Sequence, residues 1–247
     1  MDNPKIAAFS CYTWNWEYTK VVAKAIKEHY PECLILFGGP QIPEDPDSKA
    51  FFENHPYVDS VIIGEGEEAF LQILLTVHDN DKPNKIIKFP RMKELTSPSP
   101  YASGIFDRLI RENPNVEWST TLETNRGCPY GCTFCDWGSL TYSKVKKFDA
   151  ERVYKELEWV GQKGCDFVSI TDANFGIFAD RDMAIARKLV EVQQKYDNPK
   201  SYTISWAKNQ KREVVDIVKM LIYEGGSKIG LNLSVQSMDE HTLEVIK

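Results

Sequence analysis

Apolar and polar positions alternate along the first third of the chain in a way that predicts strands separated by helices. Short apolar runs, typical of strands buried in a sheet, lie at 5–11, 33–37 and 58–63, and segments of helical period lie at 17–30 and 67–77. Val21, Val22, Ala25 and Ile26 share one side of the first helix and are expected to pack on the sheet. Strands that alternate with helices favour a parallel sheet with both faces covered.

The same alternation resumes later in the chain and predicts four further βα units. The expected strands are 116–124, 167–171, 202–206 and 229–235, and the expected helices are 150–163, 181–196, 212–224 and one more after residue 235. Asp149 and Asp180 are candidate N-caps, Ser237 and Glu240 have capping-box spacing, and Gly225–Gly226 suits a helix stop. The fold class is therefore α/β throughout.

The stretch between these halves is rich in proline. Five of the thirteen prolines lie between Pro83 and Pro114, which is typical of an inter-domain linker. We therefore expect a Rossmann-like domain over 1–84, a linker over 85–114 and a second domain over 115–247. A sheet of three strands is small, and the last helix has hardly begun at Lys247, so both domains are expected to be truncated.

Composition and charge exclude several classes of protein. With 42% hydrophobic and 27% charged residues the chain is typical of a globular protein. Its net charge of −6 gives no positive field for nucleic acid or an anionic membrane. No apolar run approaches the ~18 residues of a membrane helix, and the first residues do not resemble a secretory signal. We therefore expect a cytoplasmic protein that binds neither nucleic acid nor a membrane.

Three of the six cysteines lie within eight residues. Cys128, Cys132 and Cys135 follow the strand at 116–124, so they lie on a βα loop, where ligands collect in a parallel barrel. Gly127 and Gly131 permit the turns that would bring the three thiolates together.

Metal chemistry follows from the number of these ligands. Closed zinc sites take four protein ligands, and no fourth cysteine or histidine is near in the sequence. Three thiolates suit a four-iron cluster with one iron open. The alternative is that these three cysteines are ordinary core residues that bind no metal. For Cys11, Cys33 and Cys165 we expect such a core role.

With Phe134 before its last cysteine, the C-x-x-x-C-x-x-C motif resembles that of the radical S-adenosylmethionine superfamily. The resemblance implies a truncated (β/α) partial barrel that holds a [4Fe-4S] cluster, with S-adenosylmethionine on its open iron and flavodoxin or ferredoxin as electron donor. It also implies cofactor contacts at Phe134, at Asp172 and Asn174 after the second barrel strand, and at Ser234 and Gln236 around the end of the fourth. Asp172 and Asn174 depart from the glycine-rich form of the family pattern, and ordinary turn chemistry is their alternative.

The strand ends of the first half suggest a second ligand site. Ser10, Tyr12, Gly38, Gly39 and Gly64 follow three neighbouring strands, and glycine lets a ligand approach the backbone. Beside a radical S-adenosylmethionine domain, these strand ends resemble a cobalamin-binding domain, which implies that they line the corrin and its nucleotide tail. The family's D-x-H-x-x-G motif is missing, so no cobalt ligand is assigned. An empty scaffold with structural glycine turns is the alternative.

Taken together, the resemblances imply a cobalamin-dependent radical enzyme that transfers a methyl group to an unactivated carbon or phosphorus centre of a small molecule or a peptide. They assign no catalytic side chain. One alternative is a radical cyclisation, rearrangement or oxidation without cobalamin. The other is an inactive fragment that only binds a cluster.

Overall fold

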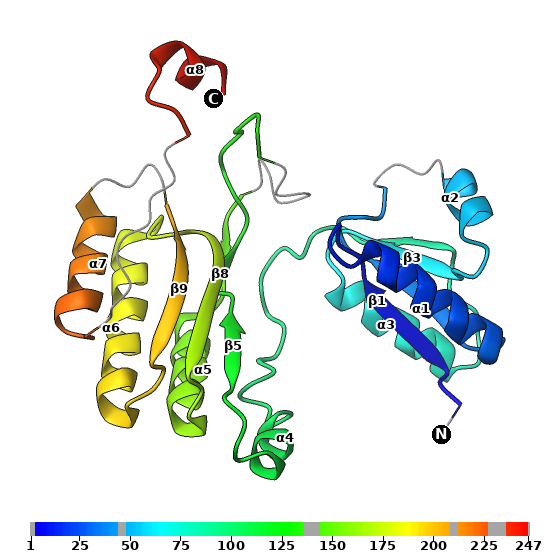
Figure 1. Ribbon diagram of the computed structural model, residues 1–247, viewed down its shortest axis with the longest axis horizontal. Helices are drawn as coiled ribbons and strands as arrows, with labels where there is room; N and C mark the ends of the chain where they lie inside the picture. Colours follow the sequence, from blue (N-terminus) through cyan, green and yellow to red (C-terminus); the bar gives the residue numbers. More distant parts are fainter. Residues whose placement is uncertain (1–2, 44–47, 136–143, 208–211, 227–235, 247) are drawn as a thin grey trace. The chain divides into compact units, whose positions relative to one another are not determined.

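The computed structural model describes residues 3–43, 48–135, 144–207, 212–226 and 236–246. The chain divides into two compact units, Met1–Lys93 and Glu94–Lys247 (Figure 1). Within the described ranges, no helix has both the length and the apolar character needed to cross a membrane.

The first unit is a parallel sheet with strand order β1-β2-β3-β4. Its elements are β1 (Ile6–Ser10), α1 (Trp16–His29), β2 (Leu34–Gly38), α2 (Ser48–Asn54), β3 (Ser60–Ile63), α3 (Glu67–His78) and β4 (Ile86–Lys88). One core, around Phe37, includes side chains of α1 and α2. Another, around Leu36, includes side chains of α3. Because neighbouring residues of β2 belong to different cores, the expected parallel sheet with two covered faces is confirmed.

Three details of this unit differ from the expectations. Val21, Val22 and Ala25 are exposed, and α1 instead buries Thr19 and Ala23. The small Ala23 lets the helix approach the sheet closely, while the apolar residues of α1 are spread over more than one of its sides. In addition, α2 forms in a stretch expected to be a loop, and β4 adds a fourth strand beyond the three expected.

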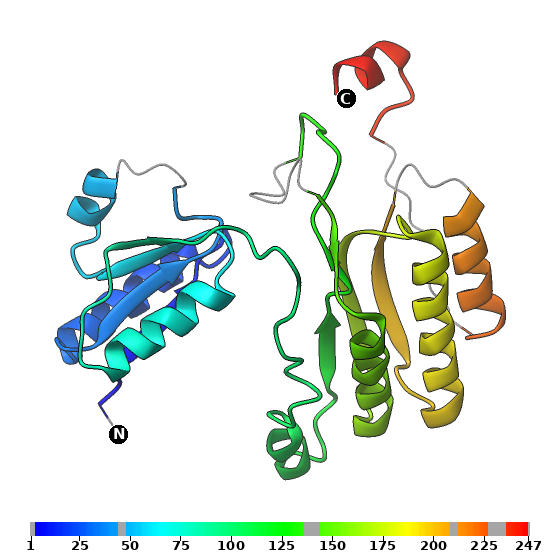
Figure 2. The same ribbon diagram turned by 180° about the vertical axis from the view of Figure 1, so that it is seen from behind.

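The second unit has a parallel sheet with order β5-β8-β9 and a small antiparallel pair, β6-β7. Its elements are α4 (Asp107–Glu112), β5 (Ser119–Leu122), β6 (Asn125–Arg126), β7 (Lys146–Lys147), α5 (Ala150–Lys163), β8 (Phe167–Phe175), α6 (Ala179–Tyr196), β9 (Ser201–Trp206), α7 (Arg212–Tyr223) and α8 (Glu240–Val245). In Figures 1 and 2, α5, α6 and α7 lie on one face of the larger sheet. Side chains of these helices and of the sheet form one hydrophobic core.

Three of the four expected βα units are described, and the strand expected at 229–235 lies outside the described residues. Asp149 caps α5 as expected, since its side chain accepts from Arg152 N. Asp180 does not cap α6, which begins one residue earlier. Asp239 rather than Ser237 caps α8. At α6 the N-cap position is Phe178, which makes no side-chain cap, so Asp180 lies inside the helix.

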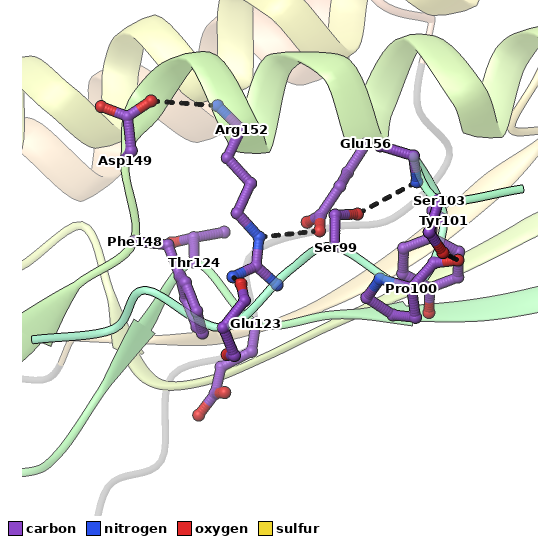
Figure 3. Close-up of polar contacts among 12 residues, drawn as sticks. Ser99, Pro100, Tyr101, Ser103, Glu123, Thr124, Phe148, Asp149, Arg152 and Glu156 are labelled. Carbon is purple, nitrogen blue, oxygen red and sulfur yellow. Dashed lines mark hydrogen bonds and ion pairs between the residues drawn. The ribbon is translucent and has the colours of Figure 1, made fainter. Parts of the chain in front are cut away.

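The segment 85–114, expected to be a linker, is partly regular and partly packed. It contains β4 and α4, its Leu95 is buried, and Tyr101 packs against the core of the second unit. Arg152 donates to Ser97 O at 2.5 Å and to Glu156 at 3.0 Å, and Figure 3 shows the second of these contacts. The prolines flank these elements rather than interrupt them, which is why proline content alone was misleading.

Gly161 marks the closest approach of α5 to α6. A Cβ at this position would lie 2.5 Å from Tyr196 Cδ2 and 2.6 Å from Val192 Cγ1. Helix propensity alone favours alanine here by about 1 kcal/mol. We expect Gly161→Ala nevertheless to destabilise the second unit by roughly 1–3 kcal/mol through overpacking. Thermal unfolding measures this, with the exposed Lys155→Ala on the same helix as control; equal midpoints for both variants would contradict the packing.

Candidate functional site

The three-cysteine loop begins directly after β6. Gly127 has a φ of +118°, so the chain turns in the left-handed region just before Cys128. Cys135 N donates to Cys132 O at 3.1 Å, which closes a tight turn between the last two cysteines. The three cysteines are not joined in disulfides, and all three are partly exposed. The loop therefore presents accessible sulfur ligands.

The other three cysteines are core residues, as expected. Cys11, Cys33 and Cys165 are at most 1% exposed. Burial raises the pKa of Cys11 and that of Cys165 to about 11, so both remain neutral thiols near neutral pH. Burial therefore distinguishes these three core cysteines from the partly exposed cysteines of the loop, which are the candidate ligands.

The number of cysteines on the loop suits a four-iron cluster, which takes three protein thiolates and leaves one iron open. The pKa of Tyr130 is raised by burial first and then by the nearby sulfurs of Cys128 and Cys132, so both sulfurs lie close to one ring. Among the described residues, no three Asp, Glu, His or Cys side chains are placed to hold one metal ion. A four-iron cluster gives each cysteine its own iron, so its ligands surround it rather than converge on a point. Three accessible thiols therefore fit such a cluster.

Asp172 ties the end of β8 to the residues ahead of the loop. Its carboxylate accepts from the backbone N of Thr124 at 2.6 Å and of Asn125 at 3.0 Å. It also accepts from Asn125 Nδ2 at 2.6 Å and from the Thr124 hydroxyl. The side chain is 1% exposed and both of its oxygens are engaged. Asp172 was expected to contact a cofactor, but the structure places it as a support for the loop.

A second group reinforces this support from the start of α6. Arg181 donates to Thr124 O at 2.6 Å and to Phe148 O at 3.2 Å. The buried Asp182 accepts from Arg181 at 3.0 Å and from Gly176 N at 2.8 Å. The strand ends that flank the cysteine loop are therefore joined by buried, charge-assisted hydrogen bonds.

The remaining expected contacts to the cluster and to S-adenosylmethionine are placed differently. Asn174 is 3% exposed, and its Nδ2 lies 3.3 Å from Cys128 Sγ. Phe134 is 48% exposed on the loop itself. Gln236 is exposed, and Ser234 lies outside the described residues. Asn174 therefore contacts a loop cysteine directly.

One polar feature of this unit was largely missed from the sequence. Thr121, Ser169 and Thr203 are paired in register across β5, β8 and β9. They alternate with buried residues of the helix-covered face, so they lie on the opposite face, and both threonines are exposed. The period-two alternation of Ser119–Leu122 carried the signal. This hydroxyl row offers hydrogen-bonding groups of the kind that a polar cofactor requires.

In the first unit, the five expected ligand-lining residues come together. Ser10, Tyr12, Gly38, Gly39 and Gly64 all line one hollow of about 440 Å³ at the ends of β1, β2 and β3. Gly39 has a φ of +102°, and a Cβ there would lie 2.7 Å from Cys11 O. Glycine is therefore required at position 39, and the absence of side chains keeps backbone open along this edge. We call this space the glycine hollow; its size is in the range of ligand pockets.

The polar turn beside the glycine hollow fixes the position of Tyr12. Asn15 accepts from Tyr12 N and donates to Ser10 O, both at 2.8 Å. Tyr12 stacks on Trp14, with ring centroids 4.5 Å apart, and Trp14 is 75% exposed. Trp16 instead packs on Phe37 in the core. The hollow thus has an ordered aromatic edge next to open backbone, which fits a large planar ligand such as a corrin.

Comparison with known families agrees with this division. The B12 binding domain model matches residues 2–74, and the Radical SAM superfamily model matches residues 122–247. These two matches fall on the unit with the glycine hollow and on the unit with the cysteine loop.

Curated relatives cover almost the whole chain. It is 39% identical over 98% of its length to the cobalamin-dependent radical SAM methyltransferase TokK of Streptomyces tokunonensis. It is 36% identical over 99% of its length to the 2-(S-pantetheinyl)-carbapenam-3-carboxylate methyltransferase of Streptantibioticus cattleyicolor. The match spans only 38% of each of these relatives.

Two solved structures have a fold similar to that of this chain. The cobalamin-dependent S-adenosylmethionine radical enzyme OxsB, with aqua-cobalamin and S-adenosylmethionine bound, aligns with a TM-score of 0.63 and 17% identity. The alignment covers 99% of this chain and 37% of the OxsB chain. The radical S-adenosylmethionine methyltransferase TsrM of Kitasatospora setae aligns with a TM-score of 0.67 and 12% identity, over 98% of this chain and 50% of TsrM. At these identities the likeness supports the fold.

The cysteine loop predicts which thiols hold iron. After anaerobic reconstitution, Cys132→Ala should retain iron and sulfide at least about 10-fold more weakly than the wild type, because one iron loses its ligand. Cys165→Ala, a buried thiol outside the loop, is the matched control and should keep the wild-type content. Equal iron in both variants would show that the loop does not hold the metal.

The buried carboxylate predicts a pH dependence. Burial raises the pKa of Asp172 to about 6, against the hydrogen bonds from Thr124 and Asn125, which lower it. The native state therefore binds the proton more tightly than the unfolded state. The stability that this difference in pKa contributes is fully present below a pH of about 3.8, which is the ordinary pKa of an aspartate. It is lost as the pH rises through about 6.

Asp172→Asn does not titrate at this position, so it isolates the effect. We compare the thermal midpoint of the wild type with that of Asp172→Asn at each pH. The difference, wild type minus variant, should decrease as the pH rises from 4 to 6 and stay constant above about pH 6. Differential scanning fluorimetry across this range is the measurement. A difference that does not change with pH would contradict the assignment.

Proposed function

This chain belongs to the radical SAM superfamily and carries a B12 binding domain, and on that premise we propose that it is part of a methyltransferase that uses cobalamin and a radical. The methyl acceptor is an unactivated centre of a small molecule. The observation that carries the proposal is the presence, in one chain, of the cysteine loop and of the glycine hollow.

The two cofactors supply the difficult chemistry: S-adenosylmethionine on a [4Fe-4S] cluster is a source of a carbon radical, and methylcobalamin is a source of the methyl group. The protein contributes binding and orientation. Cys128, Cys132 and Cys135 would hold the cluster. Ser10, Tyr12, Gly38, Gly39 and Gly64 would line the corrin, since all five border the same hollow.

Other residues of the second unit would surround S-adenosylmethionine. Phe134 lies on the cysteine loop, and Ser234 and Gln236 lie two residues apart in the sequence ahead of α8. The hydroxyl row of Thr121, Ser169 and Thr203 faces the side of the sheet that the helices leave open. Hydroxyls can both donate and accept, so they suit the ribose and carboxylate of this cofactor.

Substrate and surroundings follow from the relatives and from redox chemistry. The S. cattleyicolor relative is named for a pantetheinyl carbapenam, and we propose a small carbapenam-like substrate as the first to test. A low-potential donor such as flavodoxin or ferredoxin would deliver the electron to the cluster. Free thiols and a cluster require a reducing compartment, which favours the cytoplasm.

The reaction is tested with the full-length protein, reconstituted anaerobically with cluster and with methylcobalamin that carries a deuterated methyl group. S-adenosylmethionine and 2-(S-pantetheinyl)-carbapenam-3-carboxylate are added, and products are analysed by mass spectrometry. A product heavier by one labelled methyl group supports the proposal. Deoxyadenosine formation that is unaffected by removing cobalamin would contradict it and favour a radical cyclisation, rearrangement or oxidation.

The glycine hollow gives a prediction of its own. A Cβ at Gly38 would meet Ile62 at an ordinary 3.6 Å, so Gly38→Leu places a side chain near the hollow while leaving the backbone of β2 unstrained. We expect cobalamin binding to weaken at least about 10-fold, because bulk replaces the space the ligand needs. Absorbance titration with hydroxocobalamin measures this. Cys132→Ala is the control and should bind as the wild type; unchanged binding by Gly38→Leu would remove the hollow as the site.

A further inference from the structure

Asn174 is an amide whose position differs from the expected one. It was expected to contact S-adenosylmethionine, yet it is 3% exposed. Its Nδ2 lies 3.3 Å from Cys128 Sγ. This distance is within the range of a hydrogen bond to sulfur, which is longer than one to oxygen because sulfur is larger.

The backbone around Asn174 holds the amide in this direction. Ile177 N donates to Asn174 O at 3.3 Å, and Gly176 has a φ of +96°, so the chain turns directly after β8. Ala207 N donates to Phe175 O at 2.8 Å and fixes the neighbouring residue against the end of β9. Asn174 thus lies at the end of β8, where backbone hydrogen bonds fix the strand end and the turn that follows it.

Asp172 and Asn174 are two residues apart on β8 and both are buried. Asp172 binds Thr124 and Asn125, just ahead of the cysteine loop, and Asn174 contacts the first cysteine of that loop. One strand end therefore holds the loop at two successive points. The first point fixes the backbone, and the second reaches a sulfur.

An N–H group that donates to a ligand sulfur withdraws part of its negative charge. Reduction of a cluster adds negative charge, so such a hydrogen bond stabilises the reduced form more than the oxidised form and raises the reduction potential. An amide nitrogen is well suited to this role because it has no acceptor capacity and cannot replace the cysteine as a ligand of iron.

We propose that Asn174 is a positioning residue that orients Cys128 through an N–H···S hydrogen bond and thereby raises the potential of the cluster. This inference rests on the proposed function, because it requires that the cysteine loop hold a cluster. It assigns Asn174 to the sulfur and not to the ammonium group of S-adenosylmethionine.

Two variants and one control test the inference in the reconstituted full chain, without S-adenosylmethionine. Asn174→Leu keeps a similar volume and removes the donor, and Asn174→Asp keeps the shape but presents only oxygen. Gln193→Leu is the control, because it makes the same amide-to-aliphatic change where Gln193 Nε2 donates to Pro199 O, ahead of the start of β9. Iron content and far-UV circular dichroism are measured on each variant.

The readout is a redox titration followed by electron paramagnetic resonance. For Asn174→Leu we expect the ratio of reduced to oxidised cluster at a fixed potential to fall about five-fold, as the loss of one hydrogen bond predicts. Asn174→Asp should shift in the same direction, and Gln193→Leu should match the wild type. A second result would also support a role in holding Cys128. In that case both Asn174 variants lose iron but keep native circular dichroism, while Gln193→Leu keeps its full iron content.

Other outcomes overturn the inference and can be told apart. Asn174 variants with full iron and a wild-type titration would show that the amide does not act on the sulfur. If those variants instead bind S-adenosylmethionine more weakly at an unchanged potential, Asn174 contacts the cofactor. A wild-type protein that assembles no cluster would remove the proposed function itself, before any variant is compared.

Discussion

The second unit depends on one buried carboxylate. Asp172 accepts four hydrogen bonds from Thr124 and Asn125, so the end of β8 is joined to the turn between β5 and the cysteine loop. Removing one partner of such a group leaves buried donors without acceptors, which costs far more than the bond itself contributes. Because Arg181 binds Thr124 as well, the base of the loop is fixed from β8 and from the start of α6. A loop held in this way can present three sulfurs with little reorganisation.

The first unit solves a different problem, which is access to the backbone. At the ends of β1, β2 and β3 the chain uses glycine where a side chain would either clash, as at Gly39, or occupy the space of a ligand, as at Gly38. The hollow that results is bordered by Tyr12, whose position Asn15 fixes. The second unit would thus bind its cofactor through the sulfurs of a loop that hydrogen bonds hold in place. The first unit would bind its cofactor in a hollow where glycines leave the backbone accessible.

Much of this could be predicted from the sequence, because strong local patterns determine it. The period of apolar residues predicted the strands and helices of both sheets except α2 and β4, and cysteine spacing separated the loop from the core thiols. Patterns failed where a choice depended on tertiary contacts. Val21 and Val22 are as apolar as the buried face of α1 but lie outside it, and Asp172 looks like a polar ligand until its bonds to Thr124 are seen. No local signal distinguishes a buried acceptor from a cofactor contact, since both are polar residues at a strand end.

The central claim is that the three loop cysteines hold a four-iron cluster with one iron free to bind S-adenosylmethionine. The most direct measurement is the electron paramagnetic resonance spectrum of the reduced, reconstituted protein before and after addition of S-adenosylmethionine. We predict a single four-iron signal whose g values change on addition, because the cofactor coordinates the open iron. A signal that is identical with and without S-adenosylmethionine would contradict the claim, since it would show that no coordination position is available to the cofactor.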